Sequence, residues 1–253
     1  QAETTVVRVK DGRHGLAILS AARFGHPAKK LTMIGVTGTK GKTTTAHMIK
    51  AILESCGKKV GMIGTNGTFI GDQVTPNLNT TPESYQLHQA FAKMVEAGCQ
   101  YLVMEVSSQG IKMRRTDGIF FDYGLFTNIS PDHIGPDEHK DFKEYLYYKS
   151  RLLSMCKVGL VNQSDLHFDE IVEDASCELY TYRVKVEGEQ DSKGKADFEA
   201  GGIHYVSEPG FVGTEFAVSG RLSMEVRLGI PGIFNVDNAL GAVSLCSFLG
   251  LEP

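Results

Sequence analysis

The sequence LTMIGVTGTKGKTT occupies residues 31–44 and indicates how the chain folds. Its first seven residues are mostly apolar or β-branched, which is typical of a buried strand. Gly38 and Gly41 follow, and apolar residues then recur at helical spacing until Gly57, a residue type that commonly ends a helix. The stretch therefore predicts a strand, a glycine loop and a helix, in that order.

A glycine loop between a strand and a helix is a candidate phosphate site. Its backbone N–H groups turn inward, and the positive end of the helix dipole adds to the attraction for an anion. Lys42 would reach the β and γ phosphates of a nucleotide, and the Thr43 hydroxyl would bind magnesium. Val36 stands where the general P-loop pattern has its first glycine, and an ordinary strand-to-helix turn is the alternative. The residues expected to bind ATP are Gly38, Thr39, Lys40, Gly41, Lys42, Thr43 and Thr44.

Strand-like and helix-like segments alternate through much of the chain, with Thr81 expected to cap the helix that Pro82 begins. Residues 177–228 are instead β-rich and contain many glycines, so we expect an antiparallel flank or insertion there. The predicted fold class is α/β, a mainly parallel P-loop sheet flanked by helices with a smaller antiparallel β-rich flank. The expected strands are residues 59–65, 100–106, 122–128 and 158–162, with a hairpin at 68–74, and the expected helices are residues 82–98, 141–155 and 235–249.

Composition excludes several classes of protein. The 253 residues include 26 basic and 30 acidic side chains, and no stripe of Lys and Arg recurs along one helix, so nucleic acid is not an expected partner. No apolar run reaches the roughly 18 residues of a membrane span, which argues against a membrane protein. The five cysteines are widely spaced without a CxxC pair, so we interpret them as core thiols in a reducing cytoplasm rather than as zinc ligands or a redox dithiol.

The loop sequence GTKGKTT resembles the ATP loop of the Mur ligases, the ATP-dependent amide-forming enzymes of peptidoglycan assembly. Four further segments resemble the motifs of that family in the same order, and the resemblance covers the chain from Val9 to its end. MEVSS and the lead-in GHPxxxLxxIGVTGT resemble the MurE branch most. The four segments are NTTP at 79–82, MEVSS at 104–108, TNISPDH at 127–133 and PGIFNVDN at 231–238.

The resemblance implies an ATP-dependent ligase that adds L-Lys or meso-diaminopimelate to the D-Glu of UDP-MurNAc-L-Ala-D-Glu through an acyl phosphate. ATP and Mg²⁺ are the implied cofactors, and the UDP-MurNAc-dipeptide and an amino acid are the implied partners. A cytoplasmic monomer is expected, as in the family. The alternatives are a folylpolyglutamate, cyanophycin or MurT-like ligase, or a P-loop NTPase that acts as a nucleotide-dependent partner switch.

Three residues are candidates for the catalytic centre beside Lys42. Glu105 ends an apolar strand, where α/β folds gather ligands, and its carboxylate suits magnesium; a rim carboxylate or local ion pair is the alternative. The resemblance implies that His133 binds a second magnesium. Lys149 lies among apolar residues of a helix, where an ammonium needs a partner or must lose its charge. In Mur ligases the lysine of this helix is carbamylated and becomes a metal ligand; a snorkelling lysine is the alternative.

The resemblance also implies the substrate contacts. It implies that the UDP-linked dipeptide is bound by Thr80, Thr81, Ser107 and Arg115. Gln109 and Met113 depart from the family pattern there, and Met113 is interpreted as a packing residue.

The family's adenine motif supplies further candidates. The motif implies that Asn238 and Asn235 contact adenine, with a helix N-cap as the alternative role for Asn235. Glu138 and His139 could mimic a metal pair, but we expect a solvated or capping role for them.

The domain organisation follows from the order of the motifs. Residues 1–30 are expected to be the tail of an N-terminal UDP-binding domain with its linker, and residues 31–253 the central ATP-binding domain. The C-terminal domain that holds the incoming amino acid is expected to be absent, because no DNPR-like motif occurs. We therefore expect the chain alone to bind ATP and magnesium without completing amide synthesis.

Overall fold

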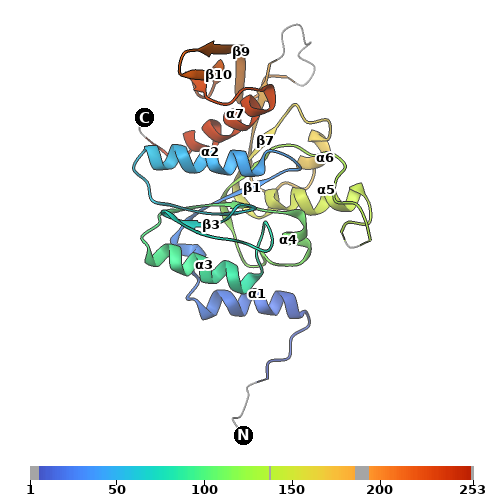
Figure 1. Ribbon diagram of the computed structural model, residues 1–253. Coiled ribbons are helices and arrows are strands. Elements are labelled where there is room, and N and C mark those ends of the chain that lie inside the picture. Colours follow the sequence, from blue (N-terminus) through green and yellow to red (C-terminus); the bar gives the residue numbers. More distant parts are fainter. Residues whose placement is uncertain (1–5, 137, 186–193, 252–253) are drawn as a thin grey trace.

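The computed structural model describes residues 6–136, 138–185 and 194–251, and within these ranges eleven strands form one continuous sheet (Figure 1). The strand order across the sheet is β11-β10-β9-β8-β7-β6-β1-β5-β2-β3-β4. The strands are β1 Thr32–Thr37, β2 Val60–Gly64, β3 Gly67–Ile70, β4 Gln73–Thr75, β5 Tyr101–Glu105, β6 Phe121–Phe126, β7 Cys156–Asn162, β8 Glu178–Val184, β9 Phe198–Glu208, β10 Phe211–Gly220 and β11 Met224–Leu228.

Helices cover both faces of this sheet (Figure 1). None of those in the described ranges is long and apolar enough for a membrane span. The α-helices are α1 Gly12–Arg23, α2 Lys42–Ser55, α3 Ser84–Glu96, α4 Ser108–Lys112, α5 Phe142–Ser150, α6 Phe168–Val172 and α7 Ile233–Ser247, with 3₁₀ turns η1 Pro27–Lys30 and η2 Arg151–Ser154.

The prediction of a mainly parallel sheet with an antiparallel flank is confirmed. All neighbouring strands from β2 to β9 across the centre pair in parallel, whereas β10 and β11 at one edge and β3 and β4 at the other pair antiparallel. The flank extends the same sheet, because β9 pairs in parallel with β8 before β10 turns back on it. Since β1 lies between β5 and β6, the loops after these three strands meet at one edge, where α/β folds bind ligands.

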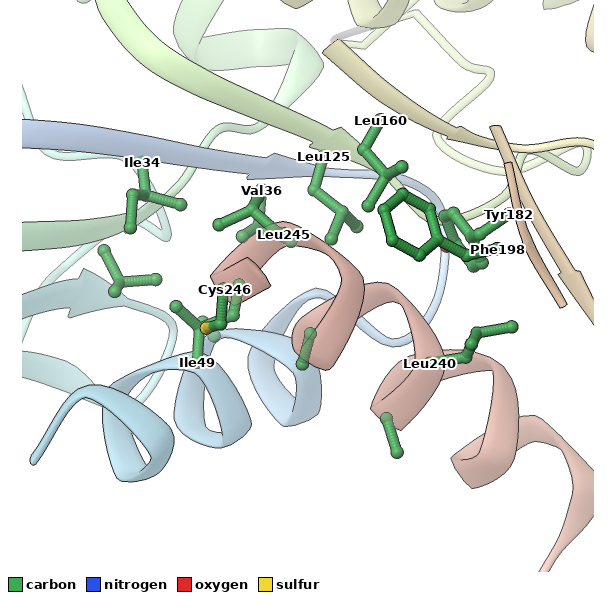
Figure 2. Packing of buried hydrophobic residues seen from close by; sticks show 14 of the residues in the cluster. Ile34, Val36, Ile49, Leu125, Leu160, Tyr182, Phe198, Leu240, Leu245 and Cys246 are labelled. Atoms are coloured by element: carbon green, nitrogen blue, oxygen red, sulfur yellow. The ribbon is translucent and has the colours of Figure 1, made fainter. Parts of the chain in front are cut away.

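The larger part of the core lies between the sheet and helices α2 and α7. Ile34 and Val36 of β1 are fully buried, and Figure 2 shows them with Leu125 of β6 on the side of the sheet that faces Leu245 and Cys246 of α7. Burying one such aliphatic side chain contributes about 1.5–3 kcal/mol. The packing fixes the end of β1 and the start of α2, and so the glycine loop between them.

Two expected helix boundaries are wrong. Helix α3 begins at Ser84, and Thr81 does not cap it. The buried Thr81 hydroxyl instead donates to the Glu105 carbonyl at 3.0 Å and accepts from the Ser107 N–H at 2.9 Å, so these partners outside the helix take the place of a capping bond. The helix expected over residues 141–155 is α5 capped by Asp141, and it tightens into η2 after Ser150.

The packing of α3 buries a histidine whose ring lies edge-on to Phe91, and this lowers the pKa of His88 to about 4, mainly through desolvation. His88 binds a proton more tightly in the unfolded chain than in the folded chain. The folded state therefore has its full stability with respect to His88 above about pH 6.5 and loses stability as the pH falls toward 4. We expect the free energy of unfolding to drop by about 2 kcal/mol from pH 7 to pH 5 on this account. Urea unfolding of His88→Gln should lack that share of the pH dependence, whereas His204→Gln, at an exposed histidine, should retain it.

Candidate active site

The glycine loop is held by the segment that follows β6. The Thr39 N–H donates to the Asn128 carbonyl at 2.8 Å, and the Lys40 N–H donates to the Asn128 side-chain oxygen at 2.9 Å. The Thr127 hydroxyl donates to the Lys40 carbonyl at 2.7 Å. Gly38 lies at φ +142°, a conformation that favours glycine. The loop is therefore fixed by neighbours that are distant in sequence.

Two lysine amines meet at the base of this loop. The Lys42 amine donates to the Gly38 carbonyl at 2.9 Å and to the Thr39 carbonyl at 3.1 Å, and the Lys149 amine donates to the same Gly38 oxygen at 2.8 Å. Burial lowers the pKa of Lys42, and burial followed by repulsion from Lys42 lowers the pKa of Lys149 well below its ordinary value. Lys149 is only 2% exposed, so the snorkelling alternative is wrong. The site holds a buried amine biased toward its neutral form.

A fully buried carboxylate faces the first turn of α2. Glu105, the last residue of β5, accepts from the Thr43 hydroxyl at 2.9 Å and from the Thr65 N–H at 3.0 Å. Gly64 makes room for it, because a Cβ there would overlap the carboxylate. The rim alternative for Glu105 is therefore wrong. Carboxylate and hydroxyl oxygens are ligands that suit Mg²⁺, which usually takes only one or two carboxylates besides water and phosphate oxygens.

The part of the chain that the structure describes contains no cluster of three or more His, Cys, Asp or Glu side chains arranged for a metal. The oxygen pair of Thr43 and Glu105 nevertheless fits magnesium bound together with a nucleotide. His133 lies apart from this pair: its side chain is 50% exposed, and its Nδ1 is 2.7 Å from Glu138. The Tyr145 ring is near both His133 and Lys149: its centre is 6.1 Å from the centre of the His133 ring and 4.7 Å from the Lys149 amine. The metal role of His133 stays a prediction.

His139 is not solvated as expected, because it is fully buried. Its Nε2 is hydrogen-bonded to the Ser108 hydroxyl at 2.9 Å, and its Nδ1 lies 3.5 Å from the Glu144 carboxylate. Burial, with Lys112 nearby, lowers the pKa of His139. His139 also forms an isolated bridge with Ile134, and composition alone does not predict its burial.

The four residues expected to contact the dipeptide lie close together. The Arg115 guanidinium donates to the Thr81 carbonyl at 3.1 Å and pairs with Glu83 at 2.8 Å. Ser107 caps α4, accepting from the Gly110 N–H at 3.0 Å. Thr80 shares a hydrogen bond with Thr65 at 3.0 Å, beside Glu105. Thr81 itself is buried, so its hydroxyl supports the site from within, and substrate contact by all four stays a prediction.

A pocket of about 460 Å³ opens beside the loop. Asn238 lines it and accepts from the Thr45 hydroxyl at 3.2 Å. Asn235 is not an N-cap: Gly232 holds that position, and the Asn235 amide donates back to the Pro231 carbonyl at 2.8 Å. The pocket is lined by Lys40, Gly41, Thr44, Thr127, Asn128, Asn162, Tyr182, Phe234, Asp237 and Asn238.

Several pocket residues were not singled out from the sequence. Asn128 and Asn162 each end or follow a parallel strand at the ligand edge, the same signal that singled out Glu105. Asp237 lies one residue before Asn238, and burial raises its pKa to about 6 while the Asn162 amide donates to it at 3.4 Å. Tyr182 comes from β8 and reaches the pocket only because that strand joins the same sheet.

The loop leaves no room for a side chain at Gly41, which lies at φ +83° with Asn238 against it. A Cβ there would overlap the Asn238 side-chain oxygen. We expect Gly41→Ala to weaken ATP binding at least tenfold, or about 1.4 kcal/mol, as measured by isothermal titration calorimetry. Gly12→Ala, at a position with open space around it, is the control and should bind ATP normally.

Comparison with known proteins gives consistent results. The model of the Mur ligase middle domain matches residues 36–246, which is most of the chain. The UDP-N-acetylmuramoyl-L-alanyl-D-glutamate–2,6-diaminopimelate ligase 1 of Clostridium acetobutylicum is 41% identical over 249 residues, covering 98% of this chain and 49% of that protein. The ligase of the same name from Clostridium perfringens is 40% identical over 248 residues, with coverages of 98% and 49%.

A solved structure is similar over nearly the same span. It is that of a UDP-N-acetylmuramoyl-L-alanyl-D-glutamate–2,6-diaminopimelate ligase, with a TM-score of 0.80 and 25% identity, and the match covers 94% of this chain and 48% of that one. The chain thus spans about half the length of the curated relatives it matches.

Proposed function

This chain belongs to the Mur ligase family, and from that membership and the geometry of its site we propose that it is the ATP-binding central region of a MurE-type ligase. The observation that carries the proposal is that the loop before α2, the end of β5 and helix α5 meet at one edge of the sheet. Lys42 and Lys149 share the Gly38 carbonyl, and Thr43 lies against Glu105 at the start of the same helix. A loop that only reversed the chain direction would not need the buried amines of Lys42 and Lys149.

The proposed reaction joins the D-Glu carboxylate of UDP-MurNAc-L-Ala-D-Glu to the amine of a third amino acid. A carboxylate oxygen attacks the γ phosphorus of ATP and ADP leaves; the amine then attacks the acyl carbon, phosphate leaves, and the amine nitrogen loses a proton. Phosphoryl transfer depends on positioning and on positive charge near the transferring group. Lys42 and the N–H groups at the start of α2 would supply both. Glu105 and Thr43 would hold magnesium, which offsets phosphate charge when bound.

We further propose that Lys149 carries carbon dioxide as a carbamate. A neutral lysine amine forms an N–C bond with carbon dioxide and releases one proton, which converts a potential cation into an anion. The low pKa of Lys149 favours the neutral amine that this step requires. An ammonium beside Lys42 is unfavourable, whereas a carbamate would be attracted to Lys42 and to a metal. His133 is the proposed ligand of the second magnesium, and its ring lies near that of Tyr145.

Substrate and domain assignments follow the same proposal. Thr80, Ser107 and Arg115 would contact the dipeptide, with Thr81 holding their backbone in place. The pocket lined by Asn238 would bind adenine, and Asn235 would support the turn before helix α7.

The relatives' names contain 2,6-diaminopimelate, which favours diaminopimelate as the incoming amino acid, with L-lysine as the alternative. Residues 1–30 remain the proposed link to a UDP-binding domain, of which residues 6–30 are described and form α1 and η1.

Calorimetry of the chain with ATP, in the presence and absence of Mg²⁺, tests the proposal. We expect binding that depends on Mg²⁺, weaker binding of GTP, and no amide product when the dipeptide and either amino acid are added to the chain alone. Steady ATP hydrolysis that ignores the dipeptide would favour the alternative of a nucleotide-dependent switch. Amide product from the chain alone would contradict the proposed division into domains.

A further inference from the structure

Two cysteines that are 21 positions apart in the sequence come together at the edge of the sheet opposite the nucleotide loop. Cys156 is the first residue of β7, and Cys177 directly precedes β8. These strands run parallel with Val158 opposite Glu178. Extending that register by one residue puts Cys177 opposite Lys157, so Cys156 is offset by one residue from Cys177. The Cα atoms of the two cysteines then lie about 6 Å apart, from a strand spacing of about 4.8 Å and a rise of about 3.3 Å. Disulfides usually span about 4.4–6.8 Å between Cα atoms.

A pair of glycines makes room for the two sulfur atoms. Gly124 of β6 and Gly159 of β7 are partners in the sheet. A Cβ at Gly124 would lie 2.8 Å from the Cys156 sulfur, and one at Gly159 would lie 2.5 Å from the Cys177 sulfur. Larger residues there would displace the thiols, so the sheet leaves space for both sulfurs on adjacent strands. Cys177 also packs against the hydrophobic cluster that contains Cys156.

The two thiols differ in access and in acidity. Cys156 is buried at 3% exposure, whereas Cys177 is only partly buried. The neighbouring Cys156 thiol, together with backbone N–H groups at Gly159 and Cys177, lowers the pKa of Cys177, and the neighbouring Cys177 thiol raises the pKa of Cys156. A partly exposed thiol of lowered pKa beside a second thiol is the arrangement found in cysteines that react with oxidants and then form a disulfide.

We propose that Cys156 and Cys177 are an oxidation site, at which Cys177 reacts with a peroxide and Cys156 resolves the product into a disulfide. The Cys177 thiolate attacks one peroxide oxygen, the O–O bond breaks, and a sulfenic acid forms with release of hydroxide, which takes up a proton as water. The Cys156 sulfur then attacks the Cys177 sulfur, the S–O bond breaks, and a second water leaves. Two thiols and one hydrogen peroxide thus give one disulfide and two waters.

Treating the folded chain with hydrogen peroxide, followed by alkylation and non-reducing peptide mass spectrometry, tests this site. We expect a peptide pair linked through Cys156 and Cys177, about 2 Da lighter than the two reduced peptides together. Free thiols should fall from five to three, and dithiothreitol should restore all five. Retention of five free thiols, or a link between other cysteines, would overturn the proposal.

Single variants separate the two roles. Cys156→Ser should leave Cys177 as a sulfenic acid that dimedone labels, whereas Cys177→Ser should leave Cys156 unmodified. Cys56→Ser is the matched control at another partly buried thiol, and it should form the disulfide as the parent chain does. Equal dimedone labelling of Cys56 and Cys177 in the parent chain would contradict a specific site.

Binding of MgATP provides a measurement that is independent of the disulfide. Because the cysteines lie at the start of β7 and the glycine loop follows the end of β1, the oxidised chain should bind MgATP with unchanged affinity. Loss of ATP binding in the reduced chain would count against the ligase proposal alone, whereas absence of the disulfide would count against the oxidation site alone.

Discussion

Replacing Lys149 by alanine should abolish the uptake of carbon dioxide by the folded chain. In ¹³C NMR with labelled bicarbonate, the parent chain should show one carbamate signal that persists to lower pH than an exposed lysine allows, since burial lowers the pKa of Lys149. The variant should show none. If the carbamate takes part in phosphoryl transfer, the variant should also slow acyl-phosphate formation roughly a thousandfold, which is about 4 kcal/mol in the activation barrier.

The same helix offers a matched control for this experiment. Lys143 lies on α5 with an exposed side chain, six positions before Lys149. Lys143→Ala should keep the carbamate signal and the thermal stability of the parent chain. A carbamate signal that survives in the Lys149→Ala variant, or that disappears only in Lys143→Ala, would assign the modification elsewhere and remove the proposed role of Lys149.

The local pattern of residues predicted most of the central sheet. Glycines at 38, 41 and 57 and the helical spacing between them were enough to place β1, the loop and α2, because each of these elements is specified by neighbours in sequence. The antiparallel flank was also predicted, but its continuity with the sheet was not. Continuity depends on the parallel pairing of β8 with β9, and a strand's partner cannot be read from its own alternation of residues.

Errors in the candidate site arose where a side chain found a distant partner. Thr81 had the sequence of a helix cap, but the end of β5 and Ser107 compete successfully for its hydroxyl. His139 lies in a polar stretch, yet Ser108 and Glu144 accommodate its ring in the interior. The proximity of Cys156 and Cys177 was likewise not predicted, because they meet only through the register of two strands.

Glu105→Gln should lower the affinity for MgATP about a hundredfold, or about 2.7 kcal/mol. Gln has nearly the same shape and can still accept the bond from the Thr65 N–H, but it lacks the negative charge that a hard cation requires. The neutral side chain also brings an NH₂ group toward the oxygen atoms that now donate to the carboxylate. Calorimetric titrations with ATP, with and without Mg²⁺, should show that the loss is confined to the magnesium-dependent part of binding.

A second buried carboxylate makes this prediction selective. Glu199 of β9 is 1% exposed and pairs with Arg183 at 2.7 Å and with Lys185 at 2.7 Å, far along the sheet from the loop. Glu199→Gln should destabilise the fold by about 2 kcal/mol, because it removes the negative charge that pairs with Arg183 and Lys185, yet it should bind MgATP as the parent chain does. Glu105→Gln should show the reverse, with altered binding and little change in unfolding. If both variants lose MgATP affinity in proportion to their stability, Glu105 acts on the fold and not on the metal.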